Sequence, residues 1–122
     1  MVEDDGDVRD EIRSALEEQG HVVLEAADGQ EALAILFAES TPDVRLIISD
    51  LSMPKMTGSQ MLQVLSSYSR SSRIPVVIVS VSPPPRNPRP HEMVAAWFVK
   101  PFDMEKLLRL VASAFLPAPV KA

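Results

Sequence analysis

Short apolar runs alternate with segments of helical periodicity along this chain, and this alternation limits the fold more than any other feature. The candidate strands are Val22–Leu24, Leu46–Ile48, Val76–Val79 and Trp97–Val99. Because Val76–Val79 is β-branched throughout, without polar alternation, it should be covered on both faces. Strands that alternate with helices predict an α/β fold, in which a parallel sheet carries helices on both sides.

The segments between these runs carry apolar residues at three- and four-residue spacing, as in amphipathic helices. The residues expected to begin the helices are, in chain order, Asp5, Asp28 with Glu31, Thr57 with Gln60, and Asp103. Gly20 should end the first helix and Pro42 the second. Asp and Thr oxygens accept bonds from the free N–H groups of a helix start, whereas Gly and Pro favour its end. The helices are thus expected to be locally specified.

Composition narrows the class of protein. The 122 residues suit one domain, and 46% hydrophobic with 24% charged residues is typical of a soluble globular chain. The net charge of -5 disfavours nucleic-acid binding, which needs clustered Lys and Arg. Cysteine is absent, which excludes disulfides and zinc–thiolate sites. No apolar run approaches the roughly 20 residues of a membrane span, so a cytoplasmic protein is expected.

Polar side chains stand where the expected strands end. Asp50, Ser80 and Lys100 follow or close three of them, and Glu3 and Asp4 lie near the start of the chain. The carboxyl ends of parallel strands share one edge of a sheet, where ligands bind. Carboxylate oxygens suit Mg²⁺, and a Lys ammonium with a Ser hydroxyl can stabilise the oxygens of a transferring phosphoryl group. The pattern therefore favours phosphoryl chemistry with a divalent cation.

The most specific motif is the stretch Asp50–Gly58, with the pattern D-x-x-M-P-x-M-x-G. Together with Val2–Asp5, Pro75–Ser80 and Lys100–Phe102, in this order, it resembles the receiver domain of two-component response regulators over nearly the whole chain. The resemblance implies a flavodoxin-like (βα)5 fold, a doubly wound parallel sheet of five strands in the order 2-1-3-4-5. It implies a receiver domain over residues 1–116, with 117–122 as a tail or the start of a linker.

By this resemblance, Asp50 corresponds to the aspartate that accepts the phosphoryl group. Glu3, Asp4, Asp50 and the backbone carbonyl of Ser52 correspond to the ligands of Mg²⁺, the implied cofactor. The only chemistry implied is the phosphorylation and dephosphorylation of the domain itself, so the chain is not expected to be an enzyme with a separate substrate.

The remaining site residues are assigned in the same way. Lys100 corresponds to the lysine that contacts the phosphoryl group, and Ser80 to the switch residue. Trp97 matches the aromatic switch position, where Tyr or Phe is commoner. Ser52 and Ser82 match positions that tune the lifetime of the aspartyl phosphate in this family.

The resemblance also implies partners: a histidine kinase or phosphotransfer protein as donor, and an attached output domain or separate protein as receiver of the signal. It leaves a homodimer open and implies no direct contact with nucleic acid or membrane. Two other functions also fit parts of the sequence pattern. One is a degenerate receiver that binds partners without phosphorylation. The other is a haloacid-dehalogenase-type phosphatase, which expects a second aspartate where this chain has Ser52.

Two features depart from the family pattern. Only Met1 and Val2 precede Glu3, so the first strand is clipped. Either residues preceding Met1 are missing from the sequence, which we expect, or the sheet has lost much of a central strand. Five prolines lie between Pro83 and Pro90, which excludes a helix interior there and predicts a degenerate fourth helix from about Pro90 to Ala96. The proline segment is interpreted either as an extended polyproline II surface offering Arg86 and Arg89, or as a loop without contacts.

Overall fold

The computed structural model describes residues 1–40, 43–51, 58–69, 71–84 and 93–114. Within these ranges three strands form one parallel sheet in the order β1-β2-β3. They are β1 (Ile47–Ser49), β2 (Val76–Ser80) and β3 (Val94–Val99). Parallel pairing requires crossover connections, and the one between β1 and β2 contains a helix, Gly58–Ser66.

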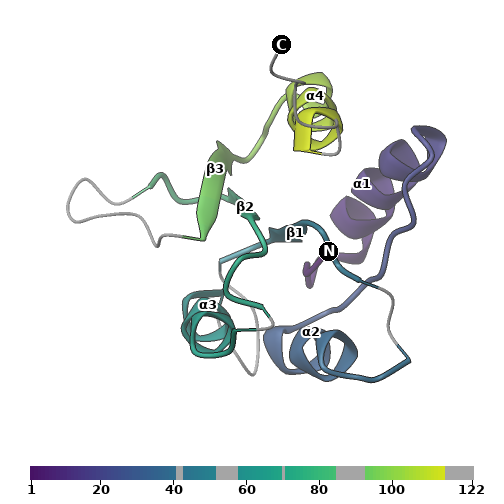
Figure 1. Cartoon of the computed structure of the whole chain (residues 1–122). Coiled ribbons are helices and arrows are strands. Elements are labelled where there is room, and N and C mark those ends of the chain that lie inside the picture. The colour runs from purple at the N-terminus through teal and green to yellow at the C-terminus, as the bar shows by residue number, and fades with distance from the viewer. Residues whose placement is uncertain (41–42, 52–57, 70, 85–92, 115–122) are drawn as a thin grey trace, which may run out of the picture.

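Four helices are formed in the described parts of the chain: α1 (Gly6–Glu18), α2 (Gly29–Leu36), α3 (Gly58–Ser66) and α4 (Met104–Ala114). Figure 1 shows α1 and α4 on one side of the sheet and α2 and α3 on the other. This arrangement confirms the doubly wound α/β architecture expected from the alternation of strands and helices.

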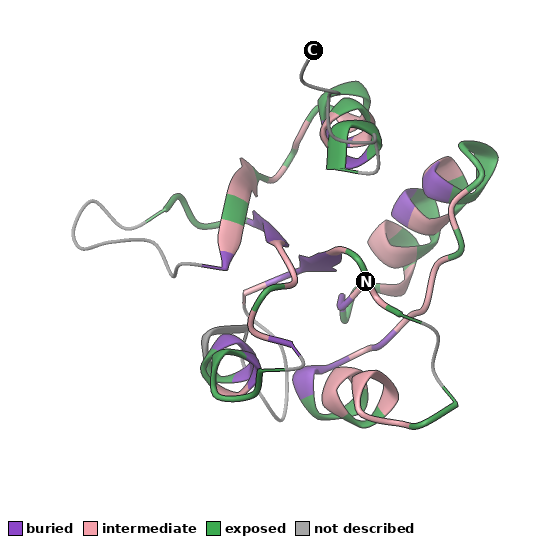
Figure 2. Cartoon of the chain, in the orientation of Figure 1, coloured by how far each residue is buried: buried purple, intermediate pink, exposed green. Residues whose placement is uncertain are grey.

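The central strand β2 is buried on both faces (Figure 2), and its five residues are at most 2% exposed. Its side chains alternate between two cores because successive strand residues point to opposite faces. Val76 and Ile78 belong to the core that contains Met61, Leu62 and Leu65 of α3. Val77 and Val79 belong to the core that contains Ile12 and Leu16 of α1 with Leu107 and Val111 of α4. The expectation of a fully covered strand is confirmed.

The start of the chain makes only a three-residue, strand-like segment. Val2 forms parallel bridges with Ala26 on one side and Ser49 on the other. Four backbone hydrogen bonds of 2.7–3.0 Å hold it, with Ala26 on one flank and Ile48 and Asp50 on the other. Val2 thus lies between Ala26 and β1, beside the three-stranded sheet.

The strand predicted over Val22–Leu24 is wrong. This segment is irregular, Val22 is 87% exposed, and the parallel bridge falls at Ala26 instead. The physical reason is that the first residues of the chain, which lie beside this segment, pair with Ala26 and Leu24 but with no described residue of the segment before Leu24. An apolar cavity of about 320 Å³ lies beside it, lined among others by Val23, Leu24 and Leu46.

Several predicted helix ends are confirmed. The Asp5 carboxylate accepts hydrogen bonds from the N–H groups of Asp7 and Val8 at the start of α1. Asp28 accepts from Glu31 N–H at 2.9 Å, and Asp103 accepts from Glu105 and Lys106. Gly20, shortly after α1, has a φ of 90°, which favours glycine. Pro42 and Thr57 lie outside the described residues.

The predicted fourth helix is wrong where it can be compared. Val94, Ala95 and Ala96 belong to β3, because they continue the pairing of β3 along β2 back to Val76. Pro83 and Pro84 are exposed and not helical, as expected, whereas residues 85–92 and the tail 117–122 fall outside the described ranges. Among the described helices, none is long and apolar enough to cross a membrane.

The buried strand generates a stability prediction. Val77→Ala removes methyl groups from a fully buried side chain and should lower the free energy of unfolding by about 2 kcal/mol. Val22→Ala makes the same chemical change at an exposed position and should change it by less than about 0.5 kcal/mol. Urea unfolding of both variants followed by circular dichroism checks this, and equal losses would contradict the burial of β2.

Candidate functional site

The parallel sheet brings three of the sequence-predicted site residues to one edge. Asp50 directly follows β1, Ser80 ends β2, and Lys100 directly follows β3. Ser80 pairs in register with Val99, and the N–H of Lys100 donates to the carbonyl of Ser80 at 2.7 Å. The expectation that these residues converge at the carboxyl ends of the strands is therefore confirmed.

The ammonium of Lys100 lies between two carboxylates. Its Nζ is 2.5 Å from Oε1 of Glu3 and 3.0 Å from Oδ2 of Asp50. The Glu3 side chain is 3% exposed, that of Asp50 10% and that of Lys100 18%. Buried carboxylates need a cationic partner because desolvation penalises their charge. Lys100 thus joins the first residues of the chain to the end of β1 through charge-assisted hydrogen bonds.

Glu3, Asp4 and Asp50 form a cluster in which one ligand oxygen from each lies within 4.8 Å of the others. Asp4 is exposed, whereas Glu3 and Asp50 are buried. Oε2 of Glu3 is buried and has no hydrogen-bond partner among the described residues. A buried anionic oxygen without a partner is costly, and a hard divalent cation would satisfy it. The residues present therefore fit Mg²⁺.

Burial and neighbouring charges shift the ionisation of this cluster. Burial raises the pKa of Glu3 to about 7, with the hydrogen bond from Lys100 opposing this and Asp50 adding to it. For Lys100, burial lowers the pKa, but its contacts with Glu3 and Asp50 outweigh burial and leave the pKa raised. Lys100 is therefore an ammonium at neutral pH and can bind an anionic group next to Asp50.

The carboxylate of Asp50 is oriented by the backbone that follows β1. Its Oδ1 accepts a hydrogen bond from the N–H of Leu51 at 2.6 Å, while Oδ2 accepts from Lys100. Ser49, buried at the end of β1, donates its hydroxyl to the carbonyl of Asp50 at 2.7 Å. A carboxylate fixed at both oxygens beside an ammonium is suited to act as a nucleophile on an anionic group.

Ser80 and Trp97 are connected through Ser82. The N–H of Ser82 donates to Oγ of Ser80 at 3.2 Å, and the indole Nε1 of Trp97 donates to the carbonyl of Ser82 at 2.9 Å. Ser80 is buried at the sheet edge, whereas Trp97 is half-buried in β3. A two-bond path thus joins the end of β2 to the indole. Ser52, the predicted carbonyl ligand of Mg²⁺, lies outside the described residues.

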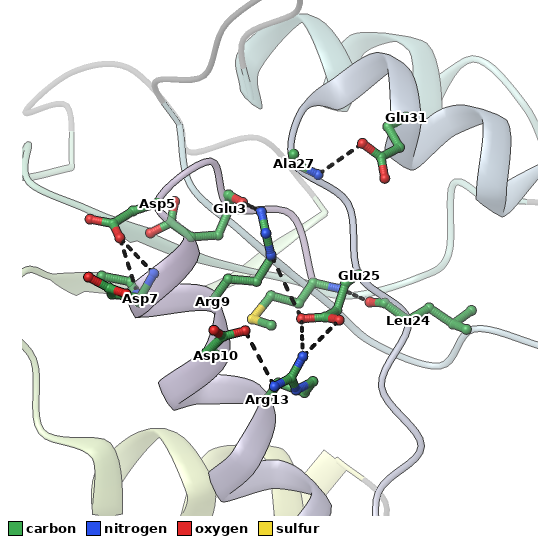
Figure 3. Close-up of polar contacts among 12 residues, drawn as sticks. Glu3, Asp5, Asp7, Arg9, Asp10, Arg13, Leu24, Glu25, Ala27 and Glu31 are labelled. Carbon is green, nitrogen blue, oxygen red and sulfur yellow. Dashed lines mark hydrogen bonds and ion pairs between the residues drawn. The ribbon is translucent and has the colours of Figure 1, made fainter.

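Sequence reasoning did not identify Arg9 and Glu25. The guanidinium of Arg9 donates to the backbone carbonyl of Glu3 at 2.9 Å, and Glu25 lies beside that guanidinium (Figure 3). No local pattern distinguishes Arg9 from a solvated helix residue. The one indication in the sequence is that Arg9 lies near the start of α1, from where its long side chain can extend back to the acidic residues that precede this helix.

Comparison with known proteins places the chain in a family. Residues 1–112 match the response regulator receiver domain. The chain is 30% identical over 109 residues to Protein PilH of Pseudomonas aeruginosa, covering 82% of each protein.

Solved structures agree with this family match. Chemotaxis response regulator CheY4 of Vibrio cholerae is 28% identical, with a TM-score of 0.75, covering 93% of this chain and 94% of that one. Response regulator TrrA of Thermotoga maritima, solved with Mg(2+)-BeF, has a TM-score of 0.78 at 21% identity, covering 93% and 95%. The latter likeness concerns the fold alone. Both the family match and the geometry at the strand ends lead to the same conclusion: the chain belongs to the response regulator receiver domain family.

Proposed function

We propose that this domain accepts a phosphoryl group on Asp50 from a histidine kinase or a phosphotransfer protein. The observation that carries the proposal is the Lys100 ammonium, which lies between Glu3 and Asp50 at the carboxyl edge of the sheet. Such a cation can neutralise the equatorial oxygens of an incoming phosphoryl group beside the nucleophile.

The chemical step is a displacement at phosphorus. A carboxylate oxygen of Asp50 forms a new O–P bond while the P–N bond of a phosphohistidine breaks, and the departing imidazole nitrogen takes a proton from solvent. Lys100 moves from its contact with Asp50 to the transferred group. Because the acceptor is a residue of the domain, this is phosphorylation of the domain itself and not turnover of a separate substrate.

The ligands of Mg²⁺ would be the carboxylates of Glu3, Asp4 and Asp50. Family resemblance adds the backbone carbonyl of Ser52 as a fourth ligand. When bound, the ion supplies positive charge that offsets the repulsion between these carboxylates and a phosphoryl dianion. The support from this chain is the buried Oε2 of Glu3, which has no hydrogen-bond partner among the described residues.

The signal would leave the site through Ser80. A phosphoryl group on Asp50 offers a new acceptor for the Ser80 hydroxyl, whose movement would strain the hydrogen bond from Ser82 and hence the one from Trp97 to Ser82. The recipient would be an attached output domain or a separate protein. The interaction-only receiver is less favoured because the acidic residues and Lys100 are assembled as phosphorylation requires.

The first prediction from this proposal concerns the acceptor. Asp50→Asn keeps the size of the side chain but removes the nucleophilic charge, so incubation with Mg²⁺ and acetyl phosphate should no longer add a phosphoryl group. Asp103→Asn is the matched control, since Asp103 is exposed at the start of α4 and Asn also caps helices. Intact mass spectrometry measures both. Undiminished phosphorylation of the Asp50→Asn protein at Glu3 or Asp4 would refute the assignment.

The second prediction concerns the metal. Asp4→Ala removes one of the three carboxylate ligands and should weaken Mg²⁺ binding at least about tenfold, measured by calorimetry. Asp7→Ala removes an exposed carboxylate outside the cluster, in the first turn of α1, and should leave the affinity close to that of the parent. If both variants bind Mg²⁺ as the parent does, Asp4 is not a ligand.

The third prediction concerns pH in the metal-free protein. Folding raises the pKa of Glu3 from 4.5 to about 7, so the folded protein holds this proton more tightly than the unfolded chain. The resulting stability is fully present below about pH 4.5 and is lost as the pH rises through about 7, by at most about 3 kcal/mol. Glu3→Gln removes this loss.

Urea unfolding of the parent and of Glu3→Gln, in EDTA at about pH 5 and about pH 8, checks the sign. The parent should lose stability relative to the Gln variant at the higher pH. The same pH dependence in both proteins would show that Glu3 is not the titrating group.

A further inference from the structure

Arg9 contacts both ends of the acidic turn formed by residues 3–5. Its backbone N–H donates to the carbonyl of Asp5 at 2.9 Å, as the first turn of α1 requires. Its guanidinium extends back to the carbonyl of Glu3, also at 2.9 Å (Figure 3). Asp4, the exposed member of the acidic cluster, stands between these two carbonyls in the chain.

The carbonyl of Glu3 needs this donor because the strand-like pairing ends there. The N–H of Glu3 donates to Ala26 at 3.0 Å, and the carbonyl of Val2 accepts from Asp50 at 2.9 Å. Beyond these bonds the chain leaves the sheet and turns into α1. A backbone carbonyl in a buried residue is costly without a donor, and Arg9 supplies it from a helix instead of from a strand.

Arg9 also belongs to a cluster of ion pairs that contains Glu25, Arg13 and Asp10. Its Nε lies 3.7 Å from Oε1 of Glu25, whose oxygens are 3.2 and 3.3 Å from Nη1 of Arg13. Arg13 also pairs with Asp10 at 3.3 Å. Two cations and two carboxylates balance one another here, so Arg9 does not bring uncompensated positive charge to the acidic turn.

We infer that Arg9 is a positioning residue for the metal site: by binding the Glu3 carbonyl it holds the backbone that presents Glu3 and Asp4. The inference rests on the proposed function, because it assumes that this acidic pair binds Mg²⁺. Residues that orient metal ligands from behind commonly change metal affinity 10–100-fold when they are removed.

Geometry and charge predict opposite outcomes for removal of the Arg9 side-chain head. If the guanidinium acted mainly by repelling a cation, its loss would tighten Mg²⁺ binding. If it positions the turn, its loss weakens binding. We expect weakening, because Glu25 already compensates the charge, whereas no other described group donates to the Glu3 carbonyl.

Arg13→Met is a matched control for Arg9→Met. Both arginines lie on α1 and both pair with Glu25. The side chain of Arg9 is 25% exposed and that of Arg13 is 33% exposed. Of these two arginines, Arg9 is the one whose guanidinium donates to the carbonyl of Glu3. Calorimetry should show Mg²⁺ affinity about tenfold lower for Arg9→Met and close to the parent for Arg13→Met. Arg9→Lys, which keeps the charge and a donor, should fall between Arg9→Met and the parent.

A second measurement separates positioning from general loss of structure. With acetyl phosphate, the Mg²⁺ concentration that gives half the maximal phosphorylation rate should rise about tenfold in Arg9→Met, while the rate at saturating Mg²⁺ stays at the parent value. Urea unfolding identifies any variant that is not folded, in which case Arg9→Lys is compared with Arg13→Met instead.

The possible results are distinct. Unchanged or tighter Mg²⁺ binding by folded Arg9→Met, or an equal loss in Arg13→Met, would overturn the positioning role. Failure of the parent protein itself to bind Mg²⁺ or to become phosphorylated would instead overturn the proposed function.

Discussion

The complete burial of β2 is the constraint on which the rest of the structure depends. A strand with apolar side chains on both faces requires a cover on each side, and the two cores meet this requirement with α1 and α4 on one face and α2 and α3 on the other. Helices that cover both faces leave the carboxyl ends of the strands as the place where polar groups can gather. The site at this edge is therefore a consequence of how the sheet is buried.

The charges at this edge are only partly balanced. Two buried carboxylates share the single ammonium of Lys100, and a third carboxylate, that of Asp4, adds negative charge from the surface. Burial is the main cause of the raised pKa of Glu3, and the neighbouring Asp50 adds to it. The excess negative charge favours a divalent cation at this edge. A proton on Glu3 or a bound cation would each reduce this excess of negative charge.

Much of the fold and the site could be predicted from the sequence because their signals are local. The β-branched run of β2, the capping aspartates and the polar residues after the strands each identify themselves within a few residues. The failures concern partners that local sequence does not reveal. Val22–Leu24 has strand composition, but the first residues of the chain pair with this segment only at Leu24. Val94–Ala96 joins β3 because β2 pairs with it. Arg9 was missed because its role depends on a turn formed earlier in the chain.

The bond from Trp97 to Ser82 also has an optical consequence. The chain contains one tryptophan, so its intrinsic indole emission comes from a single residue. That indole donates to the carbonyl of a residue whose own N–H binds the Ser80 hydroxyl, two hydrogen bonds from the end of the central strand. Indole emission depends on hydrogen bonding and solvent contact. The protein therefore carries a built-in fluorophore whose spectrum follows the state of the loop after β2, without any label being attached.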